Sequence, residues 1–146
     1  MKLVAQRVQK AKVIKVEGGE TVGEIGRGLF VLVGFKKGDS QEQAAALADK
    51  LAKLRVMSDD NDKMNLTVAD AGGKFLVVSQ FTLYADTTGG NRPSFIKAEE
   101  PEKAGKLYKF FVEKLKEKGV AVETGSFGDY MTIDAVLDGP VTILYD

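Results

Sequence analysis

The 146-residue sequence contains neither cysteine nor histidine. The absence of cysteine excludes disulfide bonds and a thiol nucleophile. The absence of histidine excludes a Ser-His-Asp triad and, together with the missing cysteines, the usual zinc sites. We therefore expect neither a metal nor a cofactor. An enzyme built on this chain must move protons with carboxylates, lysines, tyrosines, water or groups of its substrate.

Long hydrophobic runs are also missing. No apolar run approaches the roughly 18 residues of a membrane span, and the segment Met1–Arg7 loses its apolar character too early for a signal peptide. We therefore expect a cytoplasmic protein that does not enter a membrane. The 21 basic residues balance the 21 acidic ones, so an acidic partner would need a local basic patch. The length fits a single domain, residues 1–146.

Apolar runs, alternating patterns and turn residues predict an α/β fold. Ser40 and Gln43 form a capping-box pattern that predicts a helix over residues 41–53. Pro101 and Gly119 bound a second predicted helix. The predicted strands are residues 2–9, 12–16, 20–25, 29–35, 64–68, 75–78, 120–124, 130–137 and 141–145. This order of elements predicts mixed sheets in layers, with both helices on one side.

The most informative stretch follows the short apolar strand Phe75–Val78. Ser79, Gln80 and Thr82 place two hydroxyl groups and an amide at the end of this strand, where a rigid element can hold polar groups at a pocket mouth. The alternative is a strand end whose polar groups satisfy nearby backbone. A hydroxyl nucleophile needs an adjacent base, and Lys74 lies at the other end of the strand. Ligand binding or oxyanion stabilisation suits these residues better.

Two further features each have two interpretations. The Gly139-Pro140 peptide is either an ordinary trans turn or a cis turn whose carbonyl groups are rigid acceptors that approach a ligand closely. Lysines of the second predicted helix, between positions 103 and 118, either meet phosphates or form a solvated face.

Several short motifs occur in a characteristic order and spacing along the chain. They are Gln6-Arg7-Val8, Gly23-Glu24-Ile25-Gly26, Lys63-Met64-Asn65-Leu66, Gly72-Gly73, Val77-Val78, Ser79-Gln80-Phe81-Thr82-Leu83, Ala85-Asp86, Arg92-Pro93-Ser94-Phe95, Thr124-Gly125, Phe127 and Asp138-Gly139-Pro140-Val141-Thr142. Together they resemble the D-aminoacyl-tRNA deacylases, also called D-tyrosyl-tRNA(Tyr) deacylases. The resemblance spans nearly the whole chain.

The resemblance implies a three-layer α/β domain of the order β2-(βα)2-β3, with two mixed sheets and two helices on one side. It implies a homodimer that hydrolyses the ester between a D-amino acid and the 3′-terminal adenosine of tRNA, and that also acts on glycyl-tRNA. It further implies a cis Gly139-Pro140 peptide that reaches into the partner subunit's pocket and occupies the space of an L side chain. We call Gly139 and Pro140 the chiral gate.

Roles for the site residues follow from this resemblance. We expect Gln80 and Phe81 to form the oxyanion site and Thr82 to contact the substrate, with covalent attack by Thr82 as a minority alternative. Ser79, Arg7 and Phe127 are expected to bind substrate, with a structural role for Arg7 as the alternative. An aminoacyl ester is already activated and the neighbouring ribose 2′-OH can position water, so the absence of histidine is compatible with hydrolysis.

Two other functions compete with this hypothesis. A non-catalytic RNA-binding module would bind D-aminoacyl-tRNA without cleaving its ester. A serine-type hydrolase of small esters would be acylated at Ser79. Neither alternative explains why Ser79-Gln80-Phe81-Thr82 and Gly139-Pro140 occur in one chain.

Overall fold

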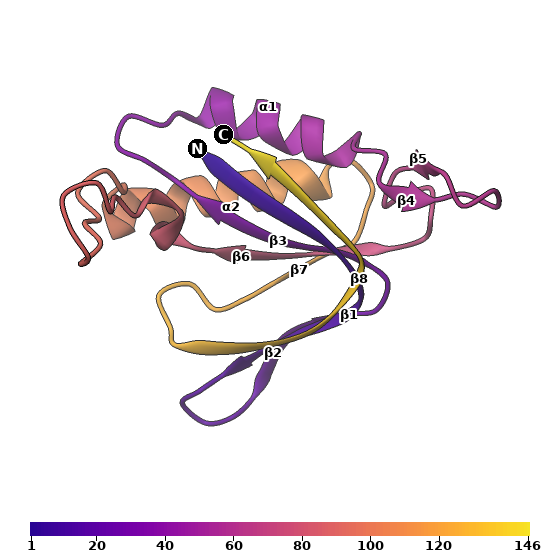
Figure 1. Ribbon diagram of the computed structural model, residues 1–146, viewed down its shortest axis with the longest axis horizontal. Coiled ribbons are helices and arrows are strands. Elements are labelled where there is room, and N and C mark those ends of the chain that lie inside the picture. Colours follow the sequence, from indigo (N-terminus) through magenta and orange to yellow (C-terminus); the bar gives the residue numbers. More distant parts are fainter.

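The computed structural model describes residues 1–146 and contains two α-helices, a short 3-10 helix and eight strands (Figure 1). In chain order the elements are β1 (Lys2–Lys15), β2 (Thr21–Ile25), β3 (Gly28–Gly34), α1 (Gln41–Ala52), β4 (Met57–Ser58), β5 (Met64–Leu66), β6 (Lys74–Ser79), the 3-10 helix η1 (Phe81–Tyr84), α2 (Pro101–Lys116), β7 (Val122–Thr124) and β8 (Met131–Tyr145).

Strand β1 is the shared element of the sheet. One edge of β1 pairs first with β3 and then with β2, and its other edge pairs with β8 along nearly its whole length. The sequence predicted two strands with a break near Lys10, but the hydrogen-bonded ladder runs through that region with only local register shifts. The prediction was wrong because the exposed residues at the bend, Gln9 and Lys10, resemble a turn in sequence.

Strand β8 corrects a second prediction. The sequence predicted separate strands on either side of a turn at Asp138-Gly139-Pro140, whereas β8 is one strand that pairs with β1 on both sides of it. Val8 pairs with Leu137 and Gln6 pairs with Thr142, so residues 138–141 all stand opposite Arg7. A bulge of this kind accommodates proline because the bulged residues need not donate to the ladder.

The elements form the three predicted layers (Figure 1). Helices α1 and α2 lie on one side of the half of the sheet that contains the parallel strands β3, β6 and β7. The bent strands β1 and β8 continue into a lower half that includes β2. The two main sheet layers are therefore halves of one continuous six-stranded sheet, and a small β4-β5 sheet is separate.

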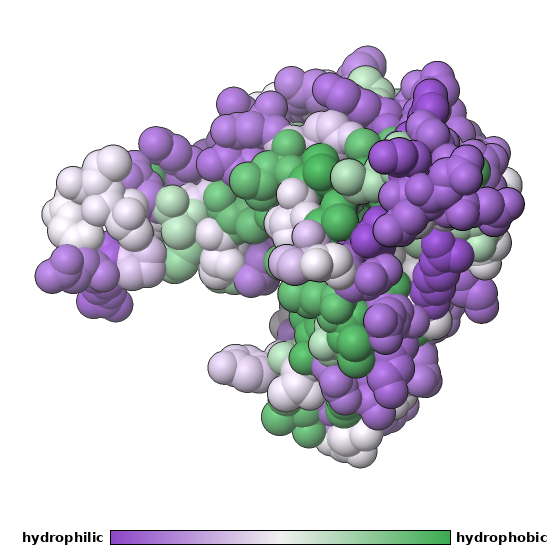
Figure 2. All heavy atoms as spheres, turned by 45° about the vertical axis from the view of Figure 1, so that its right-hand side comes forward, coloured by the Kyte–Doolittle hydropathy of each residue, from purple (hydrophilic) through white to green (hydrophobic).

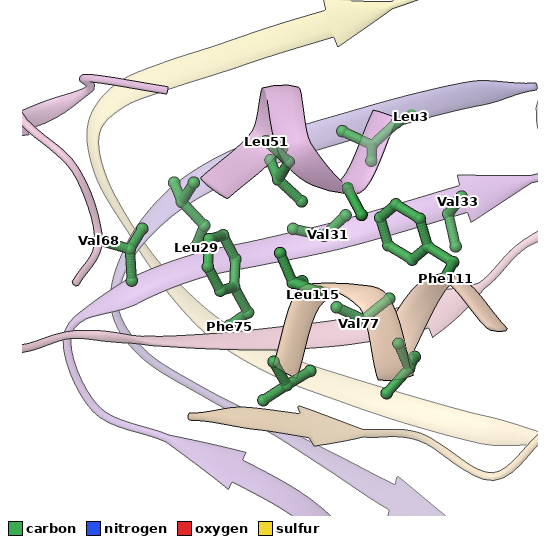
Figure 3. Close-up of a cluster of buried hydrophobic side chains, with 14 of the residues drawn as sticks. Leu3, Leu29, Val31, Val33, Leu51, Val68, Phe75, Val77, Phe111 and Leu115 are labelled. Atoms are coloured by element: carbon green, nitrogen blue, oxygen red, sulfur yellow. The ribbon is translucent and has the colours of Figure 1, made fainter. Parts of the chain in front are cut away.

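Two hydrophobic clusters hold these layers together. The larger cluster lies between the helices and the sheet, and Figure 3 shows Val31 and Val77 facing Phe111 and Leu115 of α2. The smaller cluster lies on the other side of β3 and β6 and includes Phe30. Strand β3 is nearly wholly apolar because both of its faces are covered.

Both helices begin where the sequence predicts. Ser40 and Gln43 form the reciprocal capping box at the start of α1, and Pro101 occupies the first turn of α2. Helix α1 ends at Ala52 and α2 ends at Lys116, before the positive-φ residue Gly119. Neither helix has the length and apolar character needed to cross a membrane.

Gly23 in β2 allows the close contact between β2 and β7 to be tested. A methyl group at Gly23 would overlap the carbonyl oxygen of Thr124, whereas one at Gly26 would meet no atom within 4 Å. We expect Gly23→Ala to lower the free energy of unfolding by about 2 kcal/mol, because overpacking forces the backbone to move. Gly26→Ala is the matched control and should change it by less than about 0.5 kcal/mol. Urea unfolding measures both, and equal effects would contradict the close packing.

Candidate active site

A cleft of about 710 Å³ opens where the parallel strands β3 and β6 end. Figure 2 shows the molecule hollowed below the arm at the left, with hydrophobic residues (green) gathered beside the hollow. The cleft is lined by Phe35, Lys37, Ser79, Gln80, Phe81, Phe95, Ile96, Ala98, Glu99, Glu100, Pro101, Ala104, Phe127, Gly128, Asp129, Tyr130 and Met131. Four of the predicted site residues, Ser79, Gln80, Phe81 and Phe127, thus come together.

The end of β6 determines which polar groups face the cleft. The Gln80 backbone N–H donates to the Val33 carbonyl oxygen at 2.8 Å, so the sheet already uses this donor. The Gln80 side chain makes no hydrogen bond that caps η1. Because the first N–H groups of a helix lack partners inside it, the candidate oxyanion donors are the Phe81 N–H and the Gln80 side-chain amide.

Aromatic side chains line the cleft on both sides of these polar groups. The Phe81 ring meets the Phe95 ring edge-to-face at 5.1 Å between centroids. Phe127 lies with its ring centroid 5.8 Å from that of Tyr108, whose hydroxyl donates to the Val77 carbonyl oxygen at 2.7 Å. Tyr108 therefore supports Phe127 from below and fixes it relative to β6.

Thr82 follows Phe81 in η1 but does not line the cleft. Its side chain is exposed, and its carbonyl oxygen accepts the Ala85 N–H. In a single chain Thr82 therefore lies outside the cleft, next to the cleft residue Phe81.

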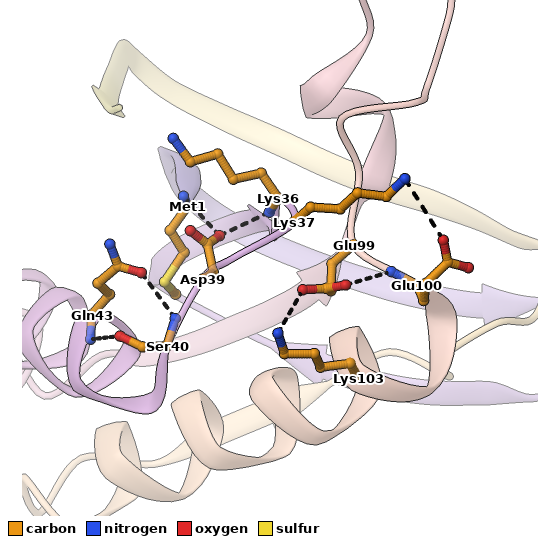
Figure 4. Close-up of polar contacts among 9 residues, drawn as sticks. All are labelled: Met1, Lys36, Lys37, Asp39, Ser40, Gln43, Glu99, Glu100 and Lys103. Carbon is orange, nitrogen blue, oxygen red and sulfur yellow. Dashed lines mark hydrogen bonds and ion pairs between the residues drawn. The ribbon is translucent and has the colours of Figure 1, made fainter.

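The carboxylates of Glu99, Glu100 and Asp129 line the cleft together with one cation, Lys37, and each carboxylate lies within 4.0 Å of a lysine. The Glu100 backbone N–H, followed by Lys103, holds the pKa of Glu99 below its ordinary value (Figure 4). The hydroxyl of Ser126, followed by Lys15, does the same for the pKa of Asp129. Glu99 and Asp129 are therefore charged at neutral pH.

Arg7 does not line the cleft. Its guanidinium group donates to the Val56 carbonyl oxygen at 2.9 Å and forms an ion pair with Asp138 at 3.2 Å. Arg7 thus ties the start of the β8 bulge to the segment before β4. In the single chain this is the structural role that the sequence left as an alternative.

The chiral gate residues lie on the exposed surface of the β8 bulge, and their peptide bond is cis. Arg7, opposite the bulge, pairs with Leu29, which in turn pairs with Phe75. Ser79 is four residues further along β6, so the bulge is about 13 Å from Ser79 along the strands and about 14 Å across them. Gly139 and Pro140 therefore do not reach the cleft of their own chain.

Most of the α2 lysines already have acidic partners. Lys103, Lys106, Lys114 and Lys116 each lie within 4.0 Å of a carboxylate, and so does Lys118, two residues beyond the end of α2. This arrangement agrees with the solvated-face interpretation of that helix.

Sequence reasoning missed the wall of the cleft formed by Phe35, Lys37 and the segment before α2. Parallel neighbouring strands end at the same edge of a sheet, so the polar residues that follow β3 were a usable signal. No sequence signal placed Glu99 beside them, because that contact joins segments about 60 residues apart in the chain.

The sequence matches a family model and curated relatives over nearly its whole length. A family model described as D-Tyr-tRNA(Tyr) deacylase matches residues 4–146. A Bacillus licheniformis protein named D-aminoacyl-tRNA deacylase is 53% identical over 146 residues, covering 100% of this chain and 98% of the relative. A protein of the same name from Thermotoga petrophila is 54% identical, covering 100% of this chain and 97% of the relative.

Two solved structures share the fold. One is titled "c-Myc DNA Unwinding Element Binding Protein" and has a TM-score of 0.91 and 38% sequence identity. The match covers 100% of this chain and 98% of the chain in that structure. The other, a probable eukaryotic D-amino acid tRNA deacylase, has a TM-score of 0.85 at 15% identity and covers 99% of this chain and 97% of its own. The fold class is thus that of these layered α/β proteins. The chain belongs to the D-Tyr-tRNA(Tyr) deacylase family, as the motifs in its sequence predict.

Tyr108 allows the support beneath Phe127 to be tested. We expect Tyr108→Phe to lower the free energy of unfolding by about 1 kcal/mol at neutral pH, because the Val77 carbonyl keeps a second donor, the Gly125 N–H at 3.3 Å. Burial raises the pKa of Tyr108 from 10.0 to about 12. The folded state therefore holds this proton more tightly than the unfolded chain, and the stabilisation fades as the pH rises from 10 to about 12.

The difference between Tyr108→Phe and the unmodified chain should accordingly shrink when urea unfolding is repeated at about pH 11. Tyr130→Phe is the matched control, because the Tyr130 side chain is 83% exposed. A constant difference at both pH values would contradict the assignment to the Tyr108 phenol.

Proposed function

We propose that the protein hydrolyses the ester bond of D-aminoacyl-tRNA and releases free tRNA and the D-amino acid. The observation that carries this proposal is the cleft at the end of β6, where Ser79, Gln80 and Phe81 of the family motif converge with Phe127. The carboxylates that line the cleft can accept hydrogen bonds from the protonated α-amino group that every aminoacyl ester carries. Glycyl-tRNA is a second substrate, because hydrogen fits wherever a D side chain does. The cytoplasmic location expected from the sequence suits a tRNA substrate.

The chemistry requires little from the side chains. The ester is already activated, and the adjacent ribose 2′-OH positions the attacking water. The Phe81 N–H and the Gln80 amide stabilise the developing oxyanion, while Ser79 and Phe127 shape the site. Thr82 contacts the substrate at the mouth of the cleft. No histidine is needed in this scheme.

Discrimination against L-amino acids requires a second copy of the chain. The chiral gate is exposed and distant from its own cleft, but a partner subunit can supply the same residues. Strand β8 pairs on one edge only, with β1. It also exposes large apolar side chains, namely Ile133, Val136, Leu137 and Leu144. Such a surface suits burial in a homodimer. Arg7 then acts by fixing the bulge that carries the gate.

The substrate and the role of Thr82 are tested with D-Tyr-tRNA and L-Tyr-tRNA. We expect rapid release of D-tyrosine and little release of L-tyrosine. Gln80→Ala should lower kcat by about 10² to 10³, the usual cost of losing an oxyanion donor. Thr82→Ala should lower it by less than about 10², far from the roughly 10⁶ that follows loss of a nucleophile. Single-turnover release of labelled tyrosine measures each value.

Other outcomes separate the competing functions. Tight binding without ester loss would replace the proposal with an RNA-binding module. Acylation of Ser79 by an active-site reagent would favour a small-ester hydrolase. Complete inactivity of Thr82→Ala with tRNA binding intact would contradict the substrate-assisted scheme.

The origin of the gate is tested with a heterodimer of two variants, Gln80→Ala and Gly139→Ala, purified through two different tags. The Cβ atom at Gly139 would lie 3.3 Å from Arg7 Nη2, and φ there is +122°, so alanine should displace the gate and allow cleavage of L-Tyr-tRNA. If the gate acts across subunits, the one intact cleft in the heterodimer receives an unmodified gate and rejects L-Tyr-tRNA.

A gate that acts within its own subunit gives the opposite result. The intact cleft would then keep the altered gate, and the heterodimer would still release L-tyrosine. The two parent homodimers serve as controls, and size-exclusion chromatography with light scattering reports the oligomeric state.

A further inference from the structure

Two lysines lie on neighbouring backbone segments beside the cleft, and one of them, Lys37, lines it. Lys36 forms an antiparallel bridge with Ala98, the Lys37 N–H donates to the Lys97 carbonyl oxygen, and the Glu99 N–H donates to the Phe35 carbonyl oxygen, the last two at 3.0 Å. Lys37 and Lys97 are therefore neighbours on the two segments, and each lies in a turn next to the bridge. Like charges this close together repel each other unless anions offset them.

The carboxylates beside these lysines offset them only in part. Lys37 is 3.9 Å from Glu100, and both side chains are more than half exposed. Lys97 is 3.1 Å from Asp86, and its side chain is 63% exposed. Surface ion pairs of this kind are weak and exchange readily. The two ammonium groups therefore remain available to a stronger anion that can bridge them.

The backbone that carries the lysine pair is held in place. Asp39, the only buried charged residue, accepts the Lys36 N–H at 2.8 Å and lies 2.8 Å from the Met1 amino group (Figure 4). Figure 4 also shows the side chains of Lys36 and Lys37 extending in different directions, with Lys37 toward Glu100. A fixed turn thus presents Lys37, but not Lys36, at the rim of the cleft.

We propose that Lys37 and Lys97 form a phosphate-binding pair that holds the phosphodiester next to the 3′-terminal adenosine. This inference rests on the proposed function, which puts the aminoacyl ester inside the cleft and the preceding phosphate at its rim. The cleft carboxylates receive the protonated amino group, and Lys37 together with Lys97 receives the RNA backbone. The α2 lysines do not line the cleft and are not needed for this role.

The kinetic test compares two substrates, D-Tyr-tRNA and D-tyrosyl-adenosine, which has the same ester but no phosphodiester. We expect Lys37→Gln with Lys97→Gln to raise KM for D-Tyr-tRNA about tenfold at low salt while kcat changes little. The slope of log kcat/KM against log salt concentration should become shallower by about 1 for each lysine that no longer meets a phosphate. The variant should hydrolyse D-tyrosyl-adenosine at least as fast as the unmodified protein, which also reports that it is folded.

Matched controls come from the same chain. Lys36→Gln changes the neighbouring lysine that extends elsewhere, and Lys106→Gln changes a lysine of α2 paired with Glu102. Both should leave the salt slope and KM unchanged. Equal losses on D-Tyr-tRNA and D-tyrosyl-adenosine, or equal effects of Lys36→Gln and Lys37→Gln, would overturn the proposal.

A binding measurement keeps this inference separate from the proposed function. A labelled single-stranded oligonucleotide ending in CCA should bind the unmodified protein with salt-dependent affinity and bind the double variant more weakly. Unchanged affinity would overturn the lysine pair even if the enzyme is active. If the unmodified protein cleaved neither ester, the proposed hydrolysis would be wrong, and the oligonucleotide comparison alone would decide the phosphate site.

Discussion

The antiparallel pairing of β1 with β8 is the interaction on which the rest of this structure depends. Strand β1 contributes Leu3 and Ala5 to the core beneath the helices, and Val8, Ala11 and Val13 to the core of the lower half. One strand can serve two cores because the ladder shifts register around Val8 and the sheet bends there. Without a continuous partner in β8, the bend would expose the backbone groups of both strands.

This pairing also keeps the chiral gate apart from the cleft of the same chain. The bulge that fits the ladder around the bend carries Gly139 and Pro140, while the parallel strands β3 and β6 end at the cleft far from it. A gate built on a rigid sheet is positioned more accurately than one on a loop. The separation means that a complete site requires two chains in the proposed mechanism.

The cleft has an uneven charge distribution that suits an aminoacyl-nucleic acid ester. Charged carboxylates line it, and Lys37 lies at its edge on a turn fixed by Asp39, next to Lys97 on the neighbouring segment. An α-ammonium group and an RNA phosphate lie at the two ends of the same substrate, so the two signs need not compete. In the proposed mechanism the protein supplies shape and fixed charges, and the substrate contributes its own reactivity.

The sequence by itself determined the helices, the buried strands and the family, because capping residues, hydrophobic periodicity and short motifs are local properties. It also grouped Ser79, Gln80 and Phe81, which are adjacent in the chain. Only the tertiary structure decided that the strands on either side of Lys10 and of Gly139 are continuous, because a ladder partner overrides local turn signals. It alone placed Arg7 against the bulge and Lys37 beside Lys97, because such contacts depend on how segments distant in the sequence come together.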